Sequence, residues 1–391
     1  MNRPAGIKLD EYDFFGFDLD HTICQYNLKK IVTSSFDFMT DYLDKEKQYR
    51  GFKQPLSFKD KNFLSRGLFI DTQNGNLLKT SSNGAILRAS HGTRLLTKNE
   101  ICKIYGTENN LESVSTMIAK KLGEDRRQSA SKVFSAMDFS DLVLSLVYAK
   151  AVDKKPKTSI NQVWHDVINA LVSLYNESGI WNLDRKKELV HPTSSAVIDW
   201  LKQLHNIGCT ALITSSPPEA ANRTATIVLG PDWKNLFDFA VFNTKKPRFF
   251  ISQSRFRAIS QTGRWLSAEE TRFDLRGEYV SGSYHMIEKA LTDTLGRRPI
   301  SVYFGDSPMA DLIHSATDRV AIIAEARVEG KFKGIQRHAD ILKSSFWGSL
   351  FYEGKEPTFM GDIIMNTSFC APDLQYFTDF PINYTHIPFW K

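Results

Sequence analysis

The stretch Phe14–Thr22, which reads FFGFDLDHT, decides the fold that we expect of this chain. Its first four residues are apolar apart from one glycine, and a short apolar run bounded by polar residues is typical of a strand buried on both faces. Asp18, Asp20 and Thr22 follow directly, so polar side chains come at the carboxyl end of that strand. Open α/β sheets bind their ligands at this edge. The stretch therefore indicates an α/β protein whose functional groups follow its strands.

Two later segments repeat the pattern of a helix, a buried strand and a polar loop. In the first, apolar residues at helical spacing over 197–204 precede a strand expected at Cys209–Ile213 and the loop TSSPP. In the second, apolar residues over 286–291 precede a strand expected at Ile300–Phe304 and the loop Gly305–Asp311. Helices alternating with buried strands predict a Rossmann-like parallel sheet.

A large insertion separates the first of these units from the second. The gap is roughly 170 residues, whereas a loop between a strand and a helix usually has about 2–6. We therefore expect a catalytic core at 1–30 and 191–391 and an inserted α+β cap at 31–190. Within the cap, apolar runs and Asn-Gly turns over about 66–92 predict a β-meander, and helical spacing predicts helices over about 110–190.

The composition excludes several classes of protein. The chain has 391 residues, is 42% hydrophobic, and carries 50 basic and 44 acidic residues, which is too apolar for a disordered chain and too balanced for a dedicated nucleic-acid binder. Its four cysteines lie far apart without a C-x-x-C pair, which argues against disulfides and a zinc site. The most apolar long stretch, Val133–Val152, contains Asp138, Asp141 and Lys150, so we expect no membrane span. We expect a cytoplasmic protein that acts on a small anionic substrate.

The spacing of the acidic residues indicates a metal site. Asp18 and Asp20 stand two residues apart, and carboxylates this close repel one another unless a cation lies between them or one takes up a proton. The loop after the strand at 300–304 adds Asp306 and Asp311. Hard oxygen ligands of this kind suit Mg²⁺, which takes one or two carboxylates together with waters and a substrate phosphate.

The same residues are suited to phosphoryl transfer. Asp18 is the candidate nucleophile that would form an aspartyl-phosphate, and Asp20 is the candidate general acid and base. Thr214, Ser215 and Lys246 are candidate donors to the charged phosphoryl oxygens. A D-x-D-x-T pattern alone fits equally well a turn with helix-capping carboxylates. The order of the four elements, each after a predicted strand or loop, favours the catalytic interpretation.

These elements resemble the motifs of the haloacid dehalogenase superfamily, and more closely those of the cytosolic purine 5′-nucleotidase family. The resemblance runs over nearly the whole chain. Within that family, the runs ASHGT, LITSS and WGS resemble most the type-1 branch of the 5′-nucleotidase domain-containing proteins. The residues that carry the family resemblance are Phe14–Thr22, Arg66–Leu68, Gly75–Lys79, His91-Gly92, Lys246-Pro247, Phe249-Phe250 and Gly305-Asp306.

The resemblance implies a haloacid dehalogenase-type core and a Mg²⁺-dependent phosphomonoesterase. Its substrate would be a nucleoside 5′-monophosphate, hydrolysed through an aspartyl-phosphate. Homo-oligomers are common in the family, and the resemblance extends that expectation to this chain by analogy. The roles implied are a nucleophile at Asp18, an acid/base at Asp20, Mg²⁺ on Asp18, the backbone carbonyl of Asp20 and Asp306, a ligand-orienting carboxylate at Asp311, and phosphate or substrate contacts at Thr214, Ser215, Ser216 and Lys246.

One part of the family pattern is absent. The purine enzymes read the base with an arginine and an aspartate on a cap helix, where this chain has Ile168 and Val172. An apolar pair cannot make the polar contacts that discriminate hypoxanthine or guanine, which argues against purine specificity. The alternative function is therefore a catalytically weak regulatory or scaffold member that keeps the metal and phosphate site. Phosphotransfer to a nucleoside would use the same aspartyl-phosphate and also stays open.

Overall fold

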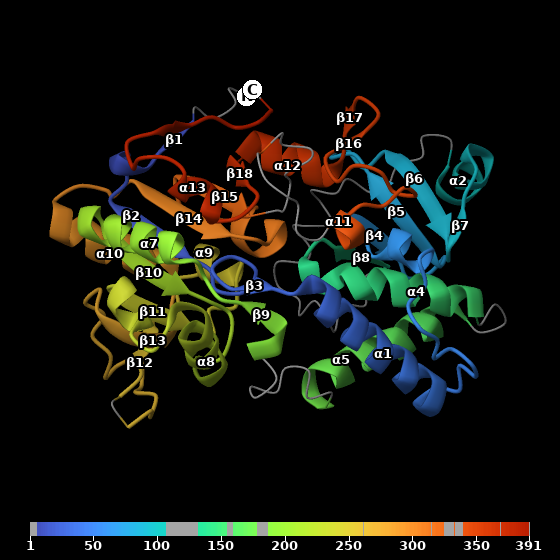
Figure 1. The fold of residues 1–391 in the computed structure, drawn as a ribbon, viewed down its shortest axis with the longest axis horizontal. Helices are drawn as coiled ribbons and strands as arrows, with labels where there is room; N and C mark the ends of the chain where they lie inside the picture. The colour runs from blue at the N-terminus through green and yellow to red at the C-terminus, as the bar shows by residue number, and fades with distance from the viewer. Residues whose placement is uncertain are drawn as a thin grey trace. The chain divides into compact units, whose positions relative to one another are not determined.

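The computed structural model describes residues 6–106, 132–154, 159–177, 187–260, 262–313, 315–323, 332, 339–367 and 369–390. The chain divides into two compact units, and each is built from separate stretches of sequence (Figure 1). The first unit contains Met1–Tyr26, Val190–Ile335 and Ile364–Lys391. The second contains Asn27–Leu189 and Gln336–Ile363.

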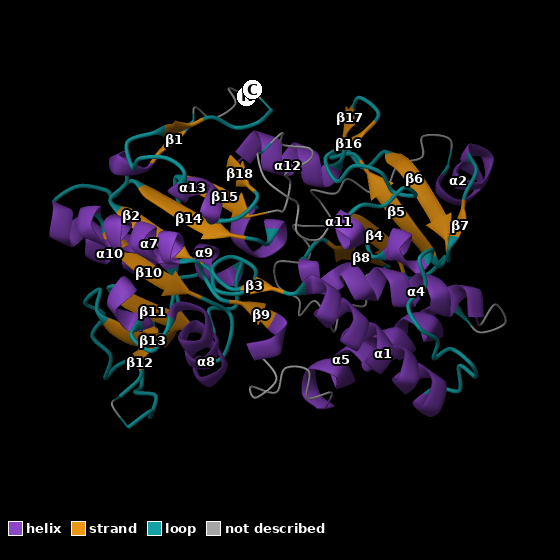
Figure 2. Ribbon diagram, viewed as in Figure 1, coloured by secondary structure: helices purple, strands orange, loops and turns teal. Residues whose placement is uncertain are grey.

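The first unit is built on an eight-stranded sheet in the order β12-β13-β11-β10-β2-β14-β15-β18 (Figure 2). All neighbours pair in parallel except β12 and β13, which pair antiparallel. This confirms the α/β class. The strands are β2 (Phe14–Phe17), β10 (Cys209–Ile213), β11 (Phe239–Phe242), β12 (Phe256–Ala258), β13 (Gly277–Ser281), β14 (Ser301–Gly305), β15 (Arg319–Ile323) and β18 (Phe369–Ala371).

Helices and two short strand pairs complete the first unit. The strand pairs are antiparallel: β1 (Ile7–Lys8) with β19 (Thr385–His386), and β3 (Gln25–Tyr26) with β9 (Val190–His191). The helices are α7 (Ser195–Ile207), α8 (Pro218–Leu229), α9 (Arg248–Ile251), α10 (Tyr284–Leu295) and α13 (Gln375–Thr378). The chain thus crosses between parallel strands through helices, as the sequence pattern predicts.

The two faces of strand β2 are buried against different helices. Side chains alternate along a strand, so Phe17 faces away from Phe14. The Phe17 ring stacks on Phe304 of β14 at 4.7 Å between centroids, and Trp200 of α7 meets both rings edge-on. On the opposite face Phe14 belongs to a buried cluster with Tyr284 of α10. Both faces are covered, which explains why this strand is a continuous apolar run.

Gly16 gives room to a tyrosine of the neighbouring strand. It pairs with Tyr303 of β14, and a Cβ at Gly16 would lie 2.7 Å from the Tyr303 ring. Without that Cβ, the ring lies over β2 and its hydroxyl donates to the backbone oxygen of Ile213 on β10 at 3.0 Å. The glycine in the FFGF run therefore determines where a buried tyrosine hydroxyl lies.

The second unit contains a five-stranded antiparallel sheet in the order β7-β6-β5-β4-β8. The strands expected over 66–92 are β4, β5 and β6. The sheet strands are β4 (Leu68–Asp71), β5 (Asn76–Thr80), β6 (Ile86–His91), β7 (Arg94–Leu95) and β8 (Val133–Ala136), and β16 (Tyr352–Glu353) and β17 (Glu356–Pro357) form a separate pair.

Among the described residues, helices α4 (Leu142–Lys154) and α5 (Ile160–Glu177) lie in the range 110–190 that is expected to be helical, and the other helices of the second unit lie outside it. Within the range 110–190, residues 110–131, 155–158 and 178–186 lie outside the described residues. The helices α1, α4 and α5 contact one another. The helices of this unit are α1 (Leu28–Glu46), α2 (Lys98–Tyr105), α4 (Leu142–Lys154), α5 (Ile160–Glu177), α11 (Ala339–Leu342) and most of α12 (Phe359–Thr367), which continues into the first unit.

The division into units differs from the expected one by a few residues, at 27–30 and at Val190, and by a long segment, at 336–363. We expected all of 191–391 in the core, but this segment belongs to the second unit. Its contacts give the reason. The buried Lys79 ammonium donates to the backbone oxygen of Trp347 at 2.6 Å and pairs with Glu353 at 2.8 Å, and Arg88 pairs with the same carboxylate. These contacts join residues more than 250 positions apart, which local sequence patterns do not reveal.

No helix among the described residues is long and apolar enough to cross a membrane.

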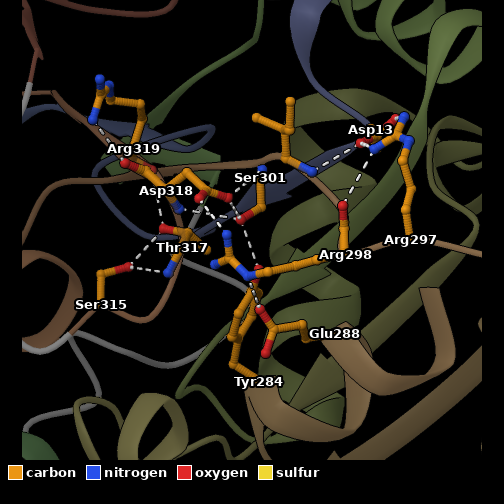
Figure 3. A network of polar contacts seen from close by, with 11 residues as sticks. Asp13, Tyr284, Glu288, Arg297, Arg298, Ser301, Ser315, Thr317, Asp318 and Arg319 are labelled. Atoms are coloured by element: carbon orange, nitrogen blue, oxygen red, sulfur yellow. Dashed lines mark hydrogen bonds and ion pairs between the residues drawn. The ribbon is translucent and has the colours of Figure 1, made fainter. Parts of the chain in front are cut away.

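A network of ion pairs holds the amino ends of the central strands together (Figure 3). The Asp13 carboxylate, just before β2, accepts from both terminal nitrogens of Arg297 at 2.7 Å and from the backbone N–H of Ile300. Asp318, just before β15, accepts from Arg298 and from the backbone N–H and hydroxyl of Ser301 at 2.8–2.9 Å. The network lies at the edge of the sheet opposite the carboxyl ends of these strands.

Asp318 gives this network a pH dependence. Burial alone would raise the pKa of Asp318, but hydrogen bonds from Arg298 and Ser301 outweigh burial and lower the pKa below its usual value. We expect Asp318→Asn to lower the free energy of unfolding by about 1–3 kcal/mol at neutral pH, because the charged acceptor is lost. A lowered pKa in the folded state stabilises above the unfolded pKa and loses this effect as the pH falls through the folded pKa. The gap between the variant and the wild type should therefore close below about pH 4.

Urea unfolding at a series of pH values measures this gap. The matched control is Asp293→Asn on α10, an exposed carboxylate that pairs with Lys289 one turn away. Its effect should stay below about 0.5 kcal/mol. A gap for Asp318→Asn that is equally large at pH 3 and pH 7 would contradict the assignment.

Candidate functional site

The carboxyl ends of three neighbouring parallel strands bring the sequence-predicted residues together. Strand β2 lies between β10 and β14. Asp18 follows β2, Thr214 follows β10 and Asp306 follows β14. The ladders continue one residue past the strands, since the Asp18 N–H donates to Phe304 O and the Thr214 N–H donates to Val241 O. The position of these residues at one sheet edge thus follows from the parallel register.

A buried lysine lies at the centre of the site. The Lys246 ammonium is 3.0 Å from an oxygen of Asp18 and 2.7 Å from an oxygen of Asp311, and it donates to the Tyr303 hydroxyl at 2.8 Å. The Lys246 side chain is only 3% exposed, and the Asp311 side chain is fully buried. Lys246 comes from the loop after β11, so three separate segments of the chain, those at the ends of β2, β11 and β14, meet at this ammonium.

Burial and crowding set the charges of this cluster. Burial raises the pKa of Asp18 to about 7, and the neighbouring carboxylates Asp311 and Asp20 raise it as well, while Lys246 opposes them. Burial alone would lower the pKa of Lys246, but Asp18 and Asp311 raise it well above its usual value. The lysine is therefore charged, and its ammonium pairs with two acidic side chains.

Three carboxylates of this site converge closely enough to hold one metal ion. Oxygens of Asp18, Asp306 and Asp311 lie within 4.8 Å of one another, and all three residues are buried. Asp311 belongs to a π-helical turn at Pro308–Leu312, and its carboxylate accepts from the Ser307 N–H. A Cβ at Gly305 would lie 2.4 Å from the Asp311 carboxylate, so only glycine permits this approach. Clustered hard oxygens of this kind fit Mg²⁺.

Asp20 lies outside that carboxylate cluster, although it follows Asp18 by two residues. One of its oxygens accepts from the Ser216 hydroxyl at 2.6 Å, and the other accepts a short hydrogen bond from the Tyr26 hydroxyl. The next residue, His21, has a φ of +61°, so the backbone turns sharply here. The two neighbouring carboxylates therefore have different environments, one beside an ammonium and the other between hydroxyls.

The loop after β10 provides hydroxyls to both parts of the site. Thr214 is buried, and its hydroxyl accepts from the Ser216 N–H at 3.1 Å. The Ser215 hydroxyl lies 3.2 Å from the Thr244 hydroxyl and accepts from the Lys246 N–H at 3.3 Å. We expected Ser216 to bind substrate, and in the structure its hydroxyl donates a hydrogen bond to the Asp20 carboxylate.

The sequence patterns did not reveal three residues of this site. Tyr303 stands in an apolar strand pattern, where it reads as a core residue, and only the small Gly16 on the paired strand gives a signal for it. Tyr26 falls in a short strand that no motif marks. Thr244 lies two residues before Lys246, in a loop position that no motif marks. Each acts through a tertiary contact, which residue spacing does not encode.

Ile168 and Val172, which we expected to stand in place of the base-reading pair, lie in the second unit. Both belong to α5, where Ile168 is buried and Val172 is half-buried. The helix has its apolar face against α1 and α4, so packing within the unit explains an apolar residue at Ile168.

Comparisons with known proteins agree with the sequence resemblance. A sequence model described as the 5′ nucleotidase family matches residues 3–332. The 5′-nucleotidase domain-containing protein 1 of Homo sapiens is 30% identical over 387 residues, which covers 89% of this chain and 83% of that protein. The Bos taurus protein of the same name is also 30% identical, with the same coverage. The human 5′-nucleotidase domain-containing protein 2 is 24% identical over 78% of this chain and 58% of that protein.

Removal of the central ammonium should destabilise the first unit. In Lys246→Met the buried Asp18 and Asp311 lose their cation, and we expect the free energy of unfolding at neutral pH to fall by about 3–5 kcal/mol. Urea unfolding without divalent ions measures this loss. The matched control is Lys245→Met, which removes an exposed charge one residue away. Equal stabilities of the two variants would show that Lys246 does not compensate the carboxylates.

Proposed function

This chain belongs to the 5′-nucleotidase family, and on that premise we propose that it is a Mg²⁺-dependent phosphomonoesterase that hydrolyses a nucleoside 5′-monophosphate. The observation that carries the proposal is the buried Lys246 ammonium between Asp18 and Asp311, beside Asp306, at the carboxyl edge of a parallel sheet. A phosphoryl group spreads negative charge over its oxygens and needs cations and hydrogen-bond donors around it. We further propose that the first unit has the haloacid dehalogenase-type core.

In the first half of the reaction, Asp18 is the nucleophile. An electron pair of its carboxylate forms a new bond to phosphorus, and the bond from phosphorus to the ester oxygen breaks. The leaving oxygen keeps the electron pair of the bond that breaks and takes a proton from the Asp20 carboxyl. The nucleoside departs, and the phosphoryl group stays on Asp18 as a mixed anhydride.

In the second half, water replaces the Asp18 oxygen on phosphorus. Asp20, now a carboxylate, takes the proton of the attacking water. The bond between phosphorus and Asp18 breaks, its electron pair returns to the Asp18 carboxylate, and inorganic phosphate leaves. Lys246 and Thr214 hold the phosphoryl oxygens, and Ser215 stands beside them on the same loop.

The residues that would hold Mg²⁺ are the carboxylates of Asp18 and Asp306 and the backbone carbonyl of Asp20. Asp311 orients this set, because its carboxylate is fixed by Lys246 and by the Ser307 N–H. When bound, Mg²⁺ supplies positive charge that offsets the negative charge of the phosphoryl oxygens.

The apolar Ile168 and Val172 favour a second candidate function. Without polar contacts to the base, this chain would act as a regulatory or scaffold protein that binds Mg²⁺ and hydrolyses no nucleotide. Metal binding and turnover therefore need separate measurements.

The first measurement is phosphate release from a panel of purine and pyrimidine 5′-monophosphates, with and without Mg²⁺. We expect Mg²⁺-dependent release by the wild type. In Asp18→Asn the release should fall by about three or more orders of magnitude, because the amide is not a nucleophile. The variant should keep its fold. The raised pKa of Asp18 means that the folded protein disfavours a negative charge at this position, and the amide of asparagine is neutral.

The matched control for this panel is Asp199→Asn, an exposed carboxylate on α7 that pairs with Lys202 in the same unit. It should keep full activity. Retention of most activity by Asp18→Asn would disprove the mechanism, and a nucleoside acceptor that increases nucleoside release without increasing phosphate release would indicate phosphotransfer. Absence of turnover in the wild type would favour the regulatory function.

Metal binding has a readout that does not depend on turnover. We expect MgCl₂ to raise the melting temperature of the wild type, because an ion that binds only the folded state stabilises it by about 2.7 kcal/mol at 100 times its Kd. Asp306→Asn should lose most of this shift, and Asp199→Asn should keep it. An equal Mg²⁺-dependent shift in Asp306→Asn would place the metal elsewhere.

A further inference from the structure

Two hydroxyl groups from separate elements hold the two oxygens of Asp20. The Ser216 hydroxyl donates to one oxygen at 2.6 Å, and the Tyr26 hydroxyl donates a short hydrogen bond to the other. Neither element contains Asp20 itself: Ser216 lies after β10, and Tyr26 belongs to β3. The plane of the carboxyl group is therefore fixed from two sides.

Both donors are themselves held in place. Tyr26 is 4% exposed, pairs with Val190 in the β3–β9 ladder, and its ring lies 4.7 Å from the His21 ring. The Ser216 N–H donates to the Thr214 hydroxyl, and its backbone oxygen accepts from Asn243 at 3.1 Å. Donors on a fixed backbone define a direction for their acceptor, whereas an aspartate in water rotates about two bonds.

We propose that Tyr26 and Ser216 are positioning residues that aim the Asp20 carboxyl at the leaving oxygen of the substrate. The inference rests on the function proposed above. It assigns these two hydroxyls to the proton transfer, and it assigns Ser216 to Asp20 rather than to the phosphate. Each carboxyl oxygen accepts more than one hydrogen bond, so a hydroxyl donor on an oxygen does not by itself prevent proton exchange there.

The proposal predicts an effect that depends on the leaving group. As the ester bond breaks, the alkoxide of a nucleoside needs the proton of Asp20, whereas p-nitrophenolate is stable enough to leave without it. The value of kcat/KM reports the steps up to departure of the leaving group. It should therefore detect poor positioning of Asp20 with a nucleoside monophosphate and not with p-nitrophenyl phosphate.

The experiment compares kcat/KM for p-nitrophenyl phosphate with kcat/KM for the 5′-monophosphate that the wild type hydrolyses fastest. In Tyr26→Phe and in Ser216→Ala we expect a fall of about tenfold or more for the nucleotide, since acid–base catalysis supplies about 10²–10⁴-fold in total. For p-nitrophenyl phosphate the change should stay within about twofold. Ser216→Thr keeps a hydroxyl and should restore much of the nucleotide rate.

The matched control is Tyr284→Phe. Tyr284 is also buried in the first unit, and its hydroxyl donates to Ser301 at 2.7 Å near the amino ends of the strands. Its loss should change both substrates alike or not at all. Melting temperatures show whether each variant is folded.

The outcomes separate this inference from the proposed function. An equal fall for both substrates in folded Tyr26→Phe and Ser216→Ala means that these residues act only on structure, and it overturns the inference while the function stands. No change with either substrate overturns it as well. Failure of the wild type to hydrolyse either ester overturns the proposed function and this inference together.

Discussion

The burial of the Lys246 ammonium between Asp18 and Asp311 is the constraint on which the rest of the site depends. Charges removed from water are costly unless they are paired and hydrogen-bonded, and here the pairing partners come from loops after β2 and β14, while the lysine follows β11. Small residues make the arrangement possible. Gly16 lets the Tyr303 ring lie over β2 with its hydroxyl on the ammonium, and Gly305 lets Asp311 approach the backbone. The site therefore requires the close packing of these strands as much as the charged residues themselves.

The charged side chains are arranged differently at the two edges of the sheet. At the amino ends of the strands, Asp13 and Asp318 each have a guanidinium partner, so charges are matched and the contacts serve stability. At the carboxyl ends, three acidic side chains converge, and the Lys246 ammonium pairs with two of them, Asp18 and Asp311. Burial and the neighbouring carboxylates raise the pKa of Asp18, and a perturbed group within such a cluster is typical of a functional site. The difference between the edges supports a ligand at the carboxyl edge.

The sequence predicts the central strands and the grouping of the candidate site residues well, because both depend on local order. A buried strand shows as an apolar run, and in a parallel sheet the residues just after neighbouring strands meet at one edge, so Asp18, Thr214 and Asp306 could be grouped without a structure. Long-range contacts were not predictable in this way. Tyr303 resembles any strand residue, Tyr26 lies in a two-residue strand, and the segment 336–363 joins the second unit through Lys79 and Arg88, hundreds of residues earlier. The spacing of apolar residues along the chain indicates helices and strands, but it does not indicate which distant residues will contact one another.

Asp18 and Asp20 illustrate how the fold gives two identical side chains different chemistry. Because they stand two residues apart at the end of a strand, a regular backbone would direct them to the same side. The backbone turns at His21, directly after Asp20, and the Asp20 carboxylate lies between the Ser216 and Tyr26 hydroxyls. The structure holds Asp18 against the ammonium, at the position of the proposed nucleophile. It holds Asp20 between two hydroxyl donors, which suits the acid–base role proposed for it. Tyr26 is the last residue of the first unit before the chain enters the second, so one of the contacts to Asp20 is made where the chain leaves the first unit.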